Sequence, residues 1–557
     1  MSVAERILSN ATYDFIATKE ELENLRIIPF ATQMINEVYS IAYYDNASLP
    51  PLSIRDYSYT SIPKCFFLTD STAMEESGIL AVQNQPGLSL KGEGVLVGII
   101  DTGIDYTNPL FLDANGMTRI LSIWDQSMTV GEQPDGFLYG VEYSKEMIDE
   151  ALTMDNPREL VPMVDRNGHG TYLASLAAGG ESEENDFVGA APESQLVVVK
   201  LKEAKQNLRE FYFYDEDTPI YQENDIMAGI AYLESKARRA DKPLVILLGV
   251  GSNSGNHIGS DPLSVTLDLF GVKTGHVAVV AAGNEAAARK HYFGKNTSLL
   301  TPVAVEMNVG ENVSGFCMEV WAFAPEEVIV VVQSPTGQRS GAEFVLYEDT
   351  QTTNFVFENT TLTLDYRIPG RQRRDLLAFL RFTTPATGIW TILIYPRNIV
   401  TGEFHMWLPM QSNVQFLQPE PDTTITTPGM AEVPITTGGY NVFTDAIYIQ
   451  SGRGFDALGR VKPDFCGPAV LVEGAGLLNN YVENTGTSVA AAITAGATAQ
   501  ALEWGIVRGN ARTMNSQEVK NLFIRGCIRE ENRSYPNQEW GYGKLNVFNS
   551  FDILRQK

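Results

Sequence analysis

The sequence predicts an α/β fold built on a parallel sheet, with an antiparallel β region inserted late in the chain. The apolar runs GVLVGIID, PLVILLGVG and HVAVVAAG are short and end in turns, as buried parallel strands do. Between about residues 65 and 300 such runs alternate with helical segments, which indicates helices on both faces of the sheet. From 301 to 427 short strand-like segments follow one another, from VEMNVG to FHMWLP, with no convincing helix between them.

The flanking segments complete a division into 1–60, 61–300, 301–427 and 428–557. Residues 1–60 predict a small α+β unit, with YDFIAT and SIAYYD as strands and KEELENLRIIPFATQMINEVY as a helix. The proline-containing stretch NASLPPLSIRDYSYTSIP that follows predicts an extended, poorly packed connection. After 428 the α/β character returns, and TSVAAAITAGATAQALEWG predicts a helix too apolar to lie on a surface.

Charge and composition exclude several classes of function. The 557 residues include 68 acidic and 41 basic side chains, a net charge of −27, which argues against nucleic acid and anionic membranes as partners. No run of 18 apolar residues and no secretory signal is present, and the four cysteines are scattered, so we expect a reduced cytoplasmic protein. Without a CxxC pair or an ordered oxygen-ligand loop, we expect neither a metal nor a cofactor.

Two segments supply a carboxylate and an imidazole. In VGIIDTGIDY, Asp101 ends an apolar strand at the carboxyl edge of the predicted sheet, where ligand chemistry occurs in open α/β folds. In DRNGHGTYLASLAAG, His169 lies between two glycines just before a helix of small residues. Taken alone, Asp101 is equally well a turn residue, and His169 is equally well a capping or core histidine.

Two further segments supply a hydroxyl and an amide. In NTGTSVAAAITAG, Ser488 begins the apolar helix, whose free N–H groups could hold an oxyanion, although a serine there is most often an N-cap. In VVAAGNE, Asn284 follows a buried strand, and its amide could donate to the same oxyanion. Taken together, Asp101, His169 and Ser488 form the set that nucleophilic catalysis by serine needs.

The four segments resemble the subtilase family of serine peptidases, peptidase family S8: DTG, GHGT, GN and GTS surround its aspartate, histidine, oxyanion asparagine and serine. The resemblance covers about 65–300 and 428–557 and implies a subtilisin-like doubly wound sheet with Asp101, His169 and Ser488 as its triad. YPNQEWGYGKLNV, GTSVAAAITAG and the insertion after Asn284 are similar to the clostridial group that includes the Csp spore-germination proteases. That likeness implies a jelly-roll insertion and an N-terminal prodomain that can stay bound after cleavage.

Three departures from the family pattern affect what can be carried over. Tyr172 replaces a second histidine, Ala492 replaces a common proline, and residues 247–251 read LLGVG where many subtilases have Asn-x-Ser-x-Gly. Gly249, Val250 and Gly251 can therefore bind substrate through backbone pairing, while side-chain specificity there does not carry over.

The resulting expectation is a serine endopeptidase that forms an acyl-enzyme and cleaves off its own prodomain within about residues 55–70, with RDYSYTS in the cleft. Its expected partners are a peptide or protein substrate and its own N-terminal prodomain. The alternative is a non-catalytic sensor or scaffold of the same fold, although pseudoenzymes usually lose a triad residue. A carbohydrate-binding role for the inserted region, using aromatics such as Trp321, is weaker because strand aromatics usually lie in cores. A cytoplasmic location is expected, with spore association or release by lysis also open.

Overall fold

A nine-stranded mixed sheet forms the centre of the computed structural model, which describes residues 1–23, 27–68, 77, 79–85, 88–341, 349–369 and 374–555. Its strands lie in the order β24, β23, β12, β10, β5, β8, β6 and β7, and β25 also pairs with β23. The pairs from β23 to β6 are parallel, whereas β24 and β7 are antiparallel edge strands. Their bounds are Ala446–Ile447 (β24), Ile435–Asn441 (β23), His276–Ala281 (β12), Leu244–Leu248 (β10), Leu96–Asp101 (β5), Gln195–Lys200 (β8), Ile120–Asp125 (β6), Val141–Ser144 (β7) and Phe465–Pro468 (β25).

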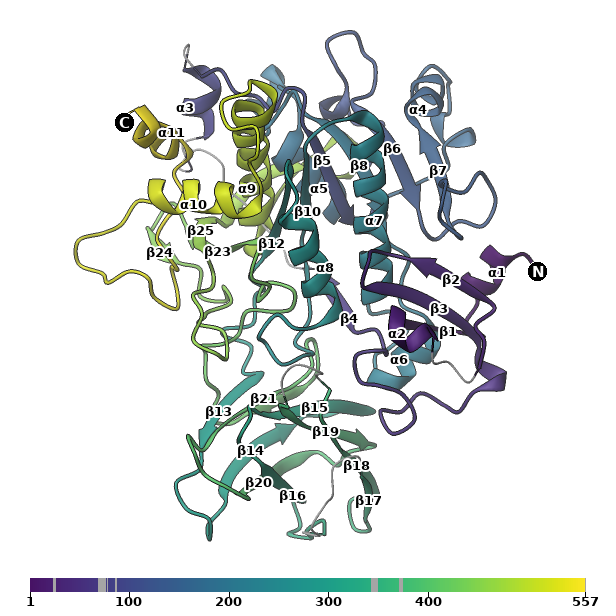
Figure 1. The fold of residues 1–557 in the computed structure, drawn as a ribbon, viewed down its shortest axis with the longest axis vertical. Coiled ribbons are helices and arrows are strands. Elements are labelled where there is room, and N and C mark those ends of the chain that lie inside the picture. The colour runs from purple at the N-terminus through teal and green to yellow at the C-terminus, as the bar shows by residue number, and fades with distance from the viewer. Residues whose placement is uncertain are drawn as a thin grey trace.

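Helices cover both faces of this sheet, as predicted (Figure 1). Alternate strand residues point to opposite faces, so Val97 and Leu247 belong to one core and Leu96 and Ile246 to the other. The first core includes α3 (Ile79–Asn84), α5 (His169–Ala178), α9 (Thr487–Leu502), α10 (Ser516–Gly526) and α11 (Val547–Arg555). The second includes α7 (Glu223–Ala240) and α8 (Pro262–Gly271). α4 (Lys145–Leu152) adds Ile148 and Ala151 to the first core, whereas α6 (Gln206–Tyr212) packs in a separate apolar cluster.

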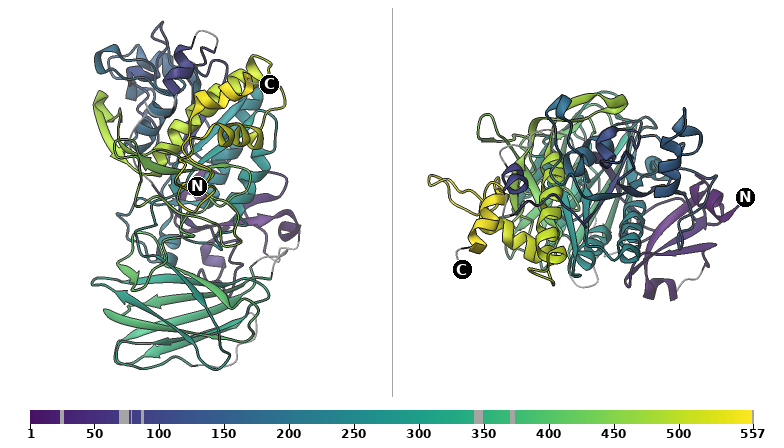
Figure 2. Two further views of the ribbon diagram at one scale, coloured as in Figure 1. Left: turned by 90° about the vertical axis from the view of Figure 1, so that its left-hand side faces the viewer. Right: turned by 90° about the horizontal axis from the view of Figure 1, so that it is seen from above.

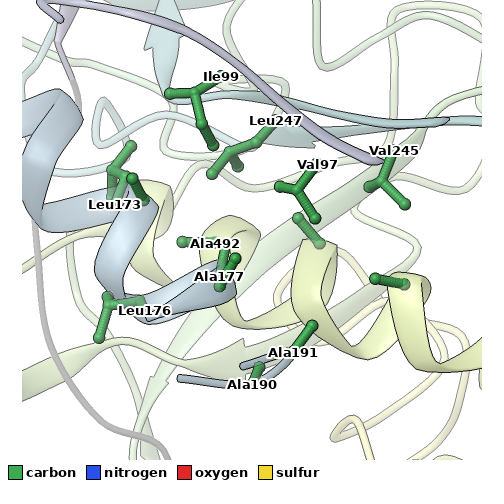
Figure 3. Close-up of a cluster of buried hydrophobic side chains, with 14 of the residues drawn as sticks. Val97, Ile99, Leu173, Leu176, Ala177, Ala190, Ala191, Val245, Leu247 and Ala492 are labelled. Atoms are coloured by element: carbon green, nitrogen blue, oxygen red, sulfur yellow. The ribbon is translucent and has the colours of Figure 1, made fainter. Parts of the chain in front are cut away.

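The packing of α5 and α9 explains their unusual sequences. Every residue of α9 is buried, and Ala177 and Ala492 lie next to each other where the two helices meet (Figure 3). A Cβ built at Gly496 would lie 2.4 Å from the Cβ of Ala190. The backbone of α9 therefore lies so close to Ala190 that there is no room for a side chain at residue 496. Small residues let the helices lie close together and close to the strands, which fixes where each helix begins. No helix among the described residues is long and apolar enough to span a bilayer.

The N-terminal unit is α+β and packs beside the central α/β part (Figures 1 and 2). It contains α1 (Val3–Leu8), β1 (Thr12–Thr18), α2 (Lys19–Glu23), β2 (Ala31–Met34) and β3 (Tyr39–Asp45), with strand order β1-β3-β2. The long helix expected from residue 19 is wrong in its second half, because Ala31–Met34 is a strand. That strand pairs with β3, so tertiary pairing overrides the helical spacing of a short amphipathic segment.

The connection after the N-terminal unit is packed rather than loose. Ile54, Tyr59 and Ile62 are all buried. RDYSYTS forms turns, so the expectation of an extended segment there is wrong, and β4 (Cys65–Leu68) is the extended segment instead. Residues 69 and 70 of the expected cleavage window lie outside the described residues.

The inserted β unit consists of two antiparallel sheets that enclose one apolar core, and Figure 2 shows them facing each other below the central sheet. The strand predicted at FVLYED falls mostly on residues outside those described. One sheet has the order β13-β21-β15-β19-β18-β17 and the other β16-β20-β14-β22. The bounds are His291–Lys295 (β13), Val303–Val309 (β14), Gly315–Ala322 (β15), Val328–Gln333 (β16), Thr350–Phe355 (β17), Thr360–Arg367 (β18), Leu376–Thr383 (β19), Gly388–Pro396 (β20), Glu403–Trp407 (β21) and Val414–Phe416 (β22).

One buried carboxylate joins the three units. Glu319 of β15 accepts a hydrogen bond from the Tyr59 hydroxyl of the N-terminal segment at 2.7 Å. It also accepts from the Gly255 N–H of the α/β part at 3.0 Å and from the indole of Trp321 at 2.8 Å. We call these residues, with Lys64, the three-unit junction; the Lys64 ammonium lies 4.1 Å from the centre of the Tyr59 ring.

Candidate active site

A buried carboxylate and imidazole meet at the carboxyl end of the central strand. Asp101 is the last residue of β5 and His169 the first of α5, and Asp101 Oδ1 lies 2.7 Å from His169 Nδ1. Both side chains are 1% exposed. Since a carboxylate only accepts, Nδ1 must carry the proton, which leaves Nε2 as the basic nitrogen of the neutral ring. The backbone N–H of Thr102 also donates to Asp101 Oδ1, at 2.8 Å.

The loop before His169 is held by a second carboxylate, Asp165. Its Oδ1 accepts from the N–H groups of Asn167 and Gly168, and its Oδ2 accepts from the N–H and hydroxyl of Thr171. Gly168 has a φ of +89°, a left-handed conformation that favours glycine, and the helix starts directly after it. These contacts fix the direction of the imidazole before any substrate binds.

Ser488 lies at the N-terminus of α9 and next to the same imidazole. A Cβ built at Gly249 would lie 3.1 Å from His169 Cε1 and 3.3 Å from Ser488 Cβ, so both side chains border one glycine. The Ser488 hydroxyl is buried, and it has no hydrogen-bond partner in the part of the chain that the structure describes. At the second residue of a helix its own N–H has no intrahelical acceptor and can serve a ligand.

Asn284 faces the start of α9 through its amide oxygen. Oδ1 accepts from the Thr487 N–H at 3.1 Å and from the Thr487 hydroxyl at 3.3 Å, and the Thr487 hydroxyl accepts from the Gly283 N–H at 2.9 Å. Because Oδ1 is used in this way, Nδ2 is the group of Asn284 that can donate to a ligand.

Two of the three predicted substrate-binding residues, Val250 and Gly251, form a strand that is already paired, and Gly249 directly precedes it. β11 (Val250–Gly251) pairs antiparallel with β4, with Val250 opposite Leu68 and Gly251 opposite Phe67. On its other side β4 pairs with β9 (Tyr221–Gln222). Gly251 must lack a side chain, because a Cβ would lie 2.3 Å from the Thr426 hydroxyl oxygen. Sequence reasoning missed β9, a two-residue strand defined only by its partner, and missed β4 as the strand between β9 and β11, although the apolar CFFL could have indicated a strand there.

Other residues singled out from the sequence have structural contacts. Tyr172 is buried and donates its hydroxyl to the Val472 carbonyl at 3.0 Å, tying α5 to β26 (Val470–Ala475), which pairs with β27 (Tyr481–Thr485). Ala492 lies in the helix–helix core. Trp321 is 2% exposed and hydrogen-bonded to Glu319, so it cannot present a face to a sugar. No group of three or more His, Cys, Asp or Glu suited to a metal occurs among the described residues.

The structure brings Asp101 and His169 into contact and places Ser488 beside them, without a hydrogen bond from its hydroxyl to any described residue. A carboxylate–imidazole pair and free helix N–H groups next to a serine can activate its hydroxyl and hold an oxyanion. Comparison with known proteins points the same way. The family model described as "Subtilase family", Peptidase_S8, matches residues 92–335, a span that includes Asp101, His169 and Asn284 but not Ser488. The CspB protease of Clostridium perfringens superposes with a TM-score of 0.77 at 30% identity, covering 86% of this chain and 96% of that one.

Two curated relatives match over a shorter stretch. The PII-type proteinase of Lacticaseibacillus paracasei is 26% identical over 247 residues, and the PI-type proteinase of Lactococcus lactis subsp. cremoris is 25% identical over 248 residues. Each alignment covers 42% of this chain but only 12% of the relative. The similarity to these two proteins therefore concerns a small part of them.

Proposed function

We propose that this chain, which belongs to the subtilase family of serine peptidases, is an active serine endopeptidase with Asp101, His169 and Ser488 as its catalytic triad. The observation that carries the proposal is the buried 2.7 Å contact between Asp101 and His169, beside a serine at a helix N-terminus. The similarity to the CspB protease supports the same activity.

In the proposed mechanism His169 Nε2 takes the proton of the Ser488 hydroxyl as Oγ attacks the carbonyl carbon of the substrate. The oxyanion that forms accepts hydrogen bonds from Asn284 Nδ2 and from the Ser488 N–H. Asp101 stabilises the imidazolium, which then gives its proton to the leaving amine. Water then attacks the resulting ester of Ser488 with His169 again acting as base and then acid, which restores the free serine.

We further propose that residues 1–68 act as a prodomain and that the inserted β unit is the jelly roll of the clostridial subtilases. The pairing of β4 with β9 and β11 supports the first proposal, because the N-terminal segment lies on the strand that an extended substrate would use. β4 runs antiparallel to β11, so its chain direction leads from Gly251 toward Gly249 and the catalytic residues. Self-cleavage would then occur on the C-terminal side of Leu68, later than RDYSYTS.

The test of the triad is labelling with a fluorophosphonate probe, which reacts with an activated serine. Wild-type protein should label and Ser488→Ala should not, while both keep the same melting temperature. Ser534→Ala, which removes an exposed serine hydroxyl from the α/β part, is the matched control and should label like wild type. A folded wild-type protein that neither labels nor hydrolyses casein would favour the non-catalytic sensor.

The test of the prodomain is N-terminal sequencing of wild type beside Ser488→Ala. We expect wild type to gain a new terminus C-terminal to Leu68 and the variant to keep its original one, at a rate independent of protein concentration. A single unchanged terminus in both proteins, with Ser488 labelling intact, would mean that the enzyme acts with the N-terminal unit covalently attached.

A further inference from the structure

We propose that the inserted β unit supports a substrate subsite that selects a large aromatic side chain, at the position that Phe67 occupies in the cleft; this inference rests on the proposed endopeptidase function. The segment β4 lies between β9 and β11 as an extended substrate would. The surroundings of each β4 side chain therefore indicate which substrate side chain would fit at that position of the cleft.

The side chain of Phe67 is fully enclosed. It is 0% exposed and belongs to a different apolar cluster from its neighbour Phe66, as the alternation of a strand requires. Its ring meets that of Tyr214 edge to face, with centroids 5.1 Å apart. Residue 67 thus faces a pocket walled by an aromatic side chain of the α/β part.

That wall belongs to a run of aromatic residues, Phe211–Tyr214 in sequence, at the C-terminal end of α6. Ring contacts connect Tyr214 to Tyr212 at 6.5 Å and Tyr212 to Phe211 at 4.8 Å. The helix ends at Phe213, which adopts a φ of +63°, a conformation uncommon for a bulky residue. Such a turn persists only where surrounding contacts hold it.

The β unit supplies those contacts. Phe379 of β19 stacks on Phe211 with centroids 6.0 Å apart and an interplanar angle of 6°. Arg381, on the same strand, donates from Nε to the Phe211 carbonyl at 3.0 Å, and its guanidinium lies 4.3 Å from the centre of the Phe213 ring. The Cys317 thiol of β15 lies 3.6 Å from the same carbonyl. The β unit therefore holds in place the aromatic run that forms the pocket wall.

The first experiment uses a synthetic peptide with the sequence of residues 61–76, carrying Ser in place of Cys65, and a second peptide that also has Ala in place of Phe67. Peptide hydrolysis is measured as kcat/KM per Ser488 labelled by fluorophosphonate. Burying an aromatic side chain predicts that the Phe peptide is cleaved about 10- to 100-fold better. Equal kcat/KM for the two peptides, with labelling intact, would overturn the subsite and leave the proposed function standing. No labelling and no hydrolysis of either peptide would overturn both.

The second experiment asks whether the β unit sets this preference. In Phe379→Ala and Arg381→Ala the ratio of the two kcat/KM values should fall about fivefold or more, while cleavage of the Ala peptide changes little. Arg381→Lys should retain only part of the wild-type ratio, because lysine lacks the planar group that stacks. Phe357→Ala, at an 84% exposed site of the same unit, is the matched control. An unchanged ratio in folded Phe379→Ala and Arg381→Ala would show that the β unit has no part in the subsite.

Discussion

The proposed catalytic edge, formed by Asp101, His169, Gly249 and Ser488 and called the catalytic edge below, and the three-unit junction around Glu319 are both buried, yet they are packed in opposite ways. At the catalytic edge a single added carbon has no room: a Cβ at Gly249 would lie 2.5 Å from Leu173 Cδ1. At the junction large rings surround one carboxylate that accepts three hydrogen bonds. The first region should therefore be damaged by additions and the second by deletions, and the predictions below test this contrast.

The largest effect is expected from removing Asn284, the proposed oxyanion donor next to the catalytic edge, which tests the chemistry of this region rather than its packing. Asn284→Ala should lower kcat by about 10²–10³ with little change in KM, because the donor acts in the transition state. Asn284→Asp keeps an oxygen for the Thr487 N–H and hydroxyl but has no donor. The kcat and KM of wild type, Asn284→Ala and Asn284→Asp are measured by steady-state kinetics on the same peptide. Near-wild-type activity in Asn284→Asp would assign Asn284 a purely structural role.

Adding one carbon at the catalytic edge should also impair activity. Gly249→Ala places its methyl group against Leu173 and the imidazole of His169, and we expect kcat/KM to fall at least about tenfold because a displacement of the base by a fraction of an ångström misaligns the reacting atoms. The double variant Gly249→Ala/Leu173→Ala makes room on one side and should recover part of the loss. If Gly249→Ala alone kept full activity, the view of this edge as closely packed would be wrong.

Deleting the carboxylate at the junction should cost stability rather than chemistry. Glu319→Leu leaves the Tyr59 hydroxyl, the Trp321 indole and the Gly255 N–H unpaired, and we expect the free energy of unfolding to fall by about 2–4 kcal/mol. Denaturant titration measures the loss, with Glu311→Leu at an exposed site of the same β unit as control. A fall in kcat of the size seen for Asn284→Ala would contradict the separation of the two regions.

The smallest effect concerns acid and the buried histidines of the β unit. Burial lowers the pKa of His405 to about 3, and the nearby His257 contributes to the lowering. Because the folded pKa lies below the unfolded value of about 6.5, the neutral ring stabilises the fold above pH ~6.5, and this contribution is lost as the pH falls toward about 3. At a pH of about 5 the loss is about 2 kcal/mol.

This acid effect is measured as the change in unfolding free energy between about pH 7 and about pH 5, for wild type and for His405→Gln. The variant should lose less stability on acidification, since glutamine does not titrate. His405 Nδ1 lies 2.9 Å from His291 Nε2, and the rings of His291 and Trp407 stack at 5.0 Å, so His291→Gln should behave similarly. If wild type, His405→Gln and His291→Gln all lost the same unfolding free energy on acidification, the acid sensitivity would arise from other groups.

The contact between Asp101 and His169, and the position of Ser488 beside them, could be predicted from sequence because the signals are local. Asp101 ends an apolar strand, His169 and Ser488 begin helices of small residues, and each lies in a short distinctive segment. The junction could not be predicted, since Tyr59 and Glu319 are brought together only by the packing of separate units. The strands β2 and β9 escape prediction for the same reason: short strands are defined by the partner they pair with.

The insertion leaves and rejoins the central sheet at adjacent points, and this has a consequence for the order of folding. The Thr426 N–H donates to the Ala282 carbonyl at 3.0 Å, and the strands on either side, β12 and β23, are parallel neighbours. Closing an unfolded loop of residues 283–425 costs about 4 kcal/mol in chain entropy. If the β unit folds first, its own strands bring these ends together and most of that cost is already met. Ser488 follows the insertion and His169 precedes it, so in that order of folding the proposed nucleophile and its proposed base come together only after the β unit has formed.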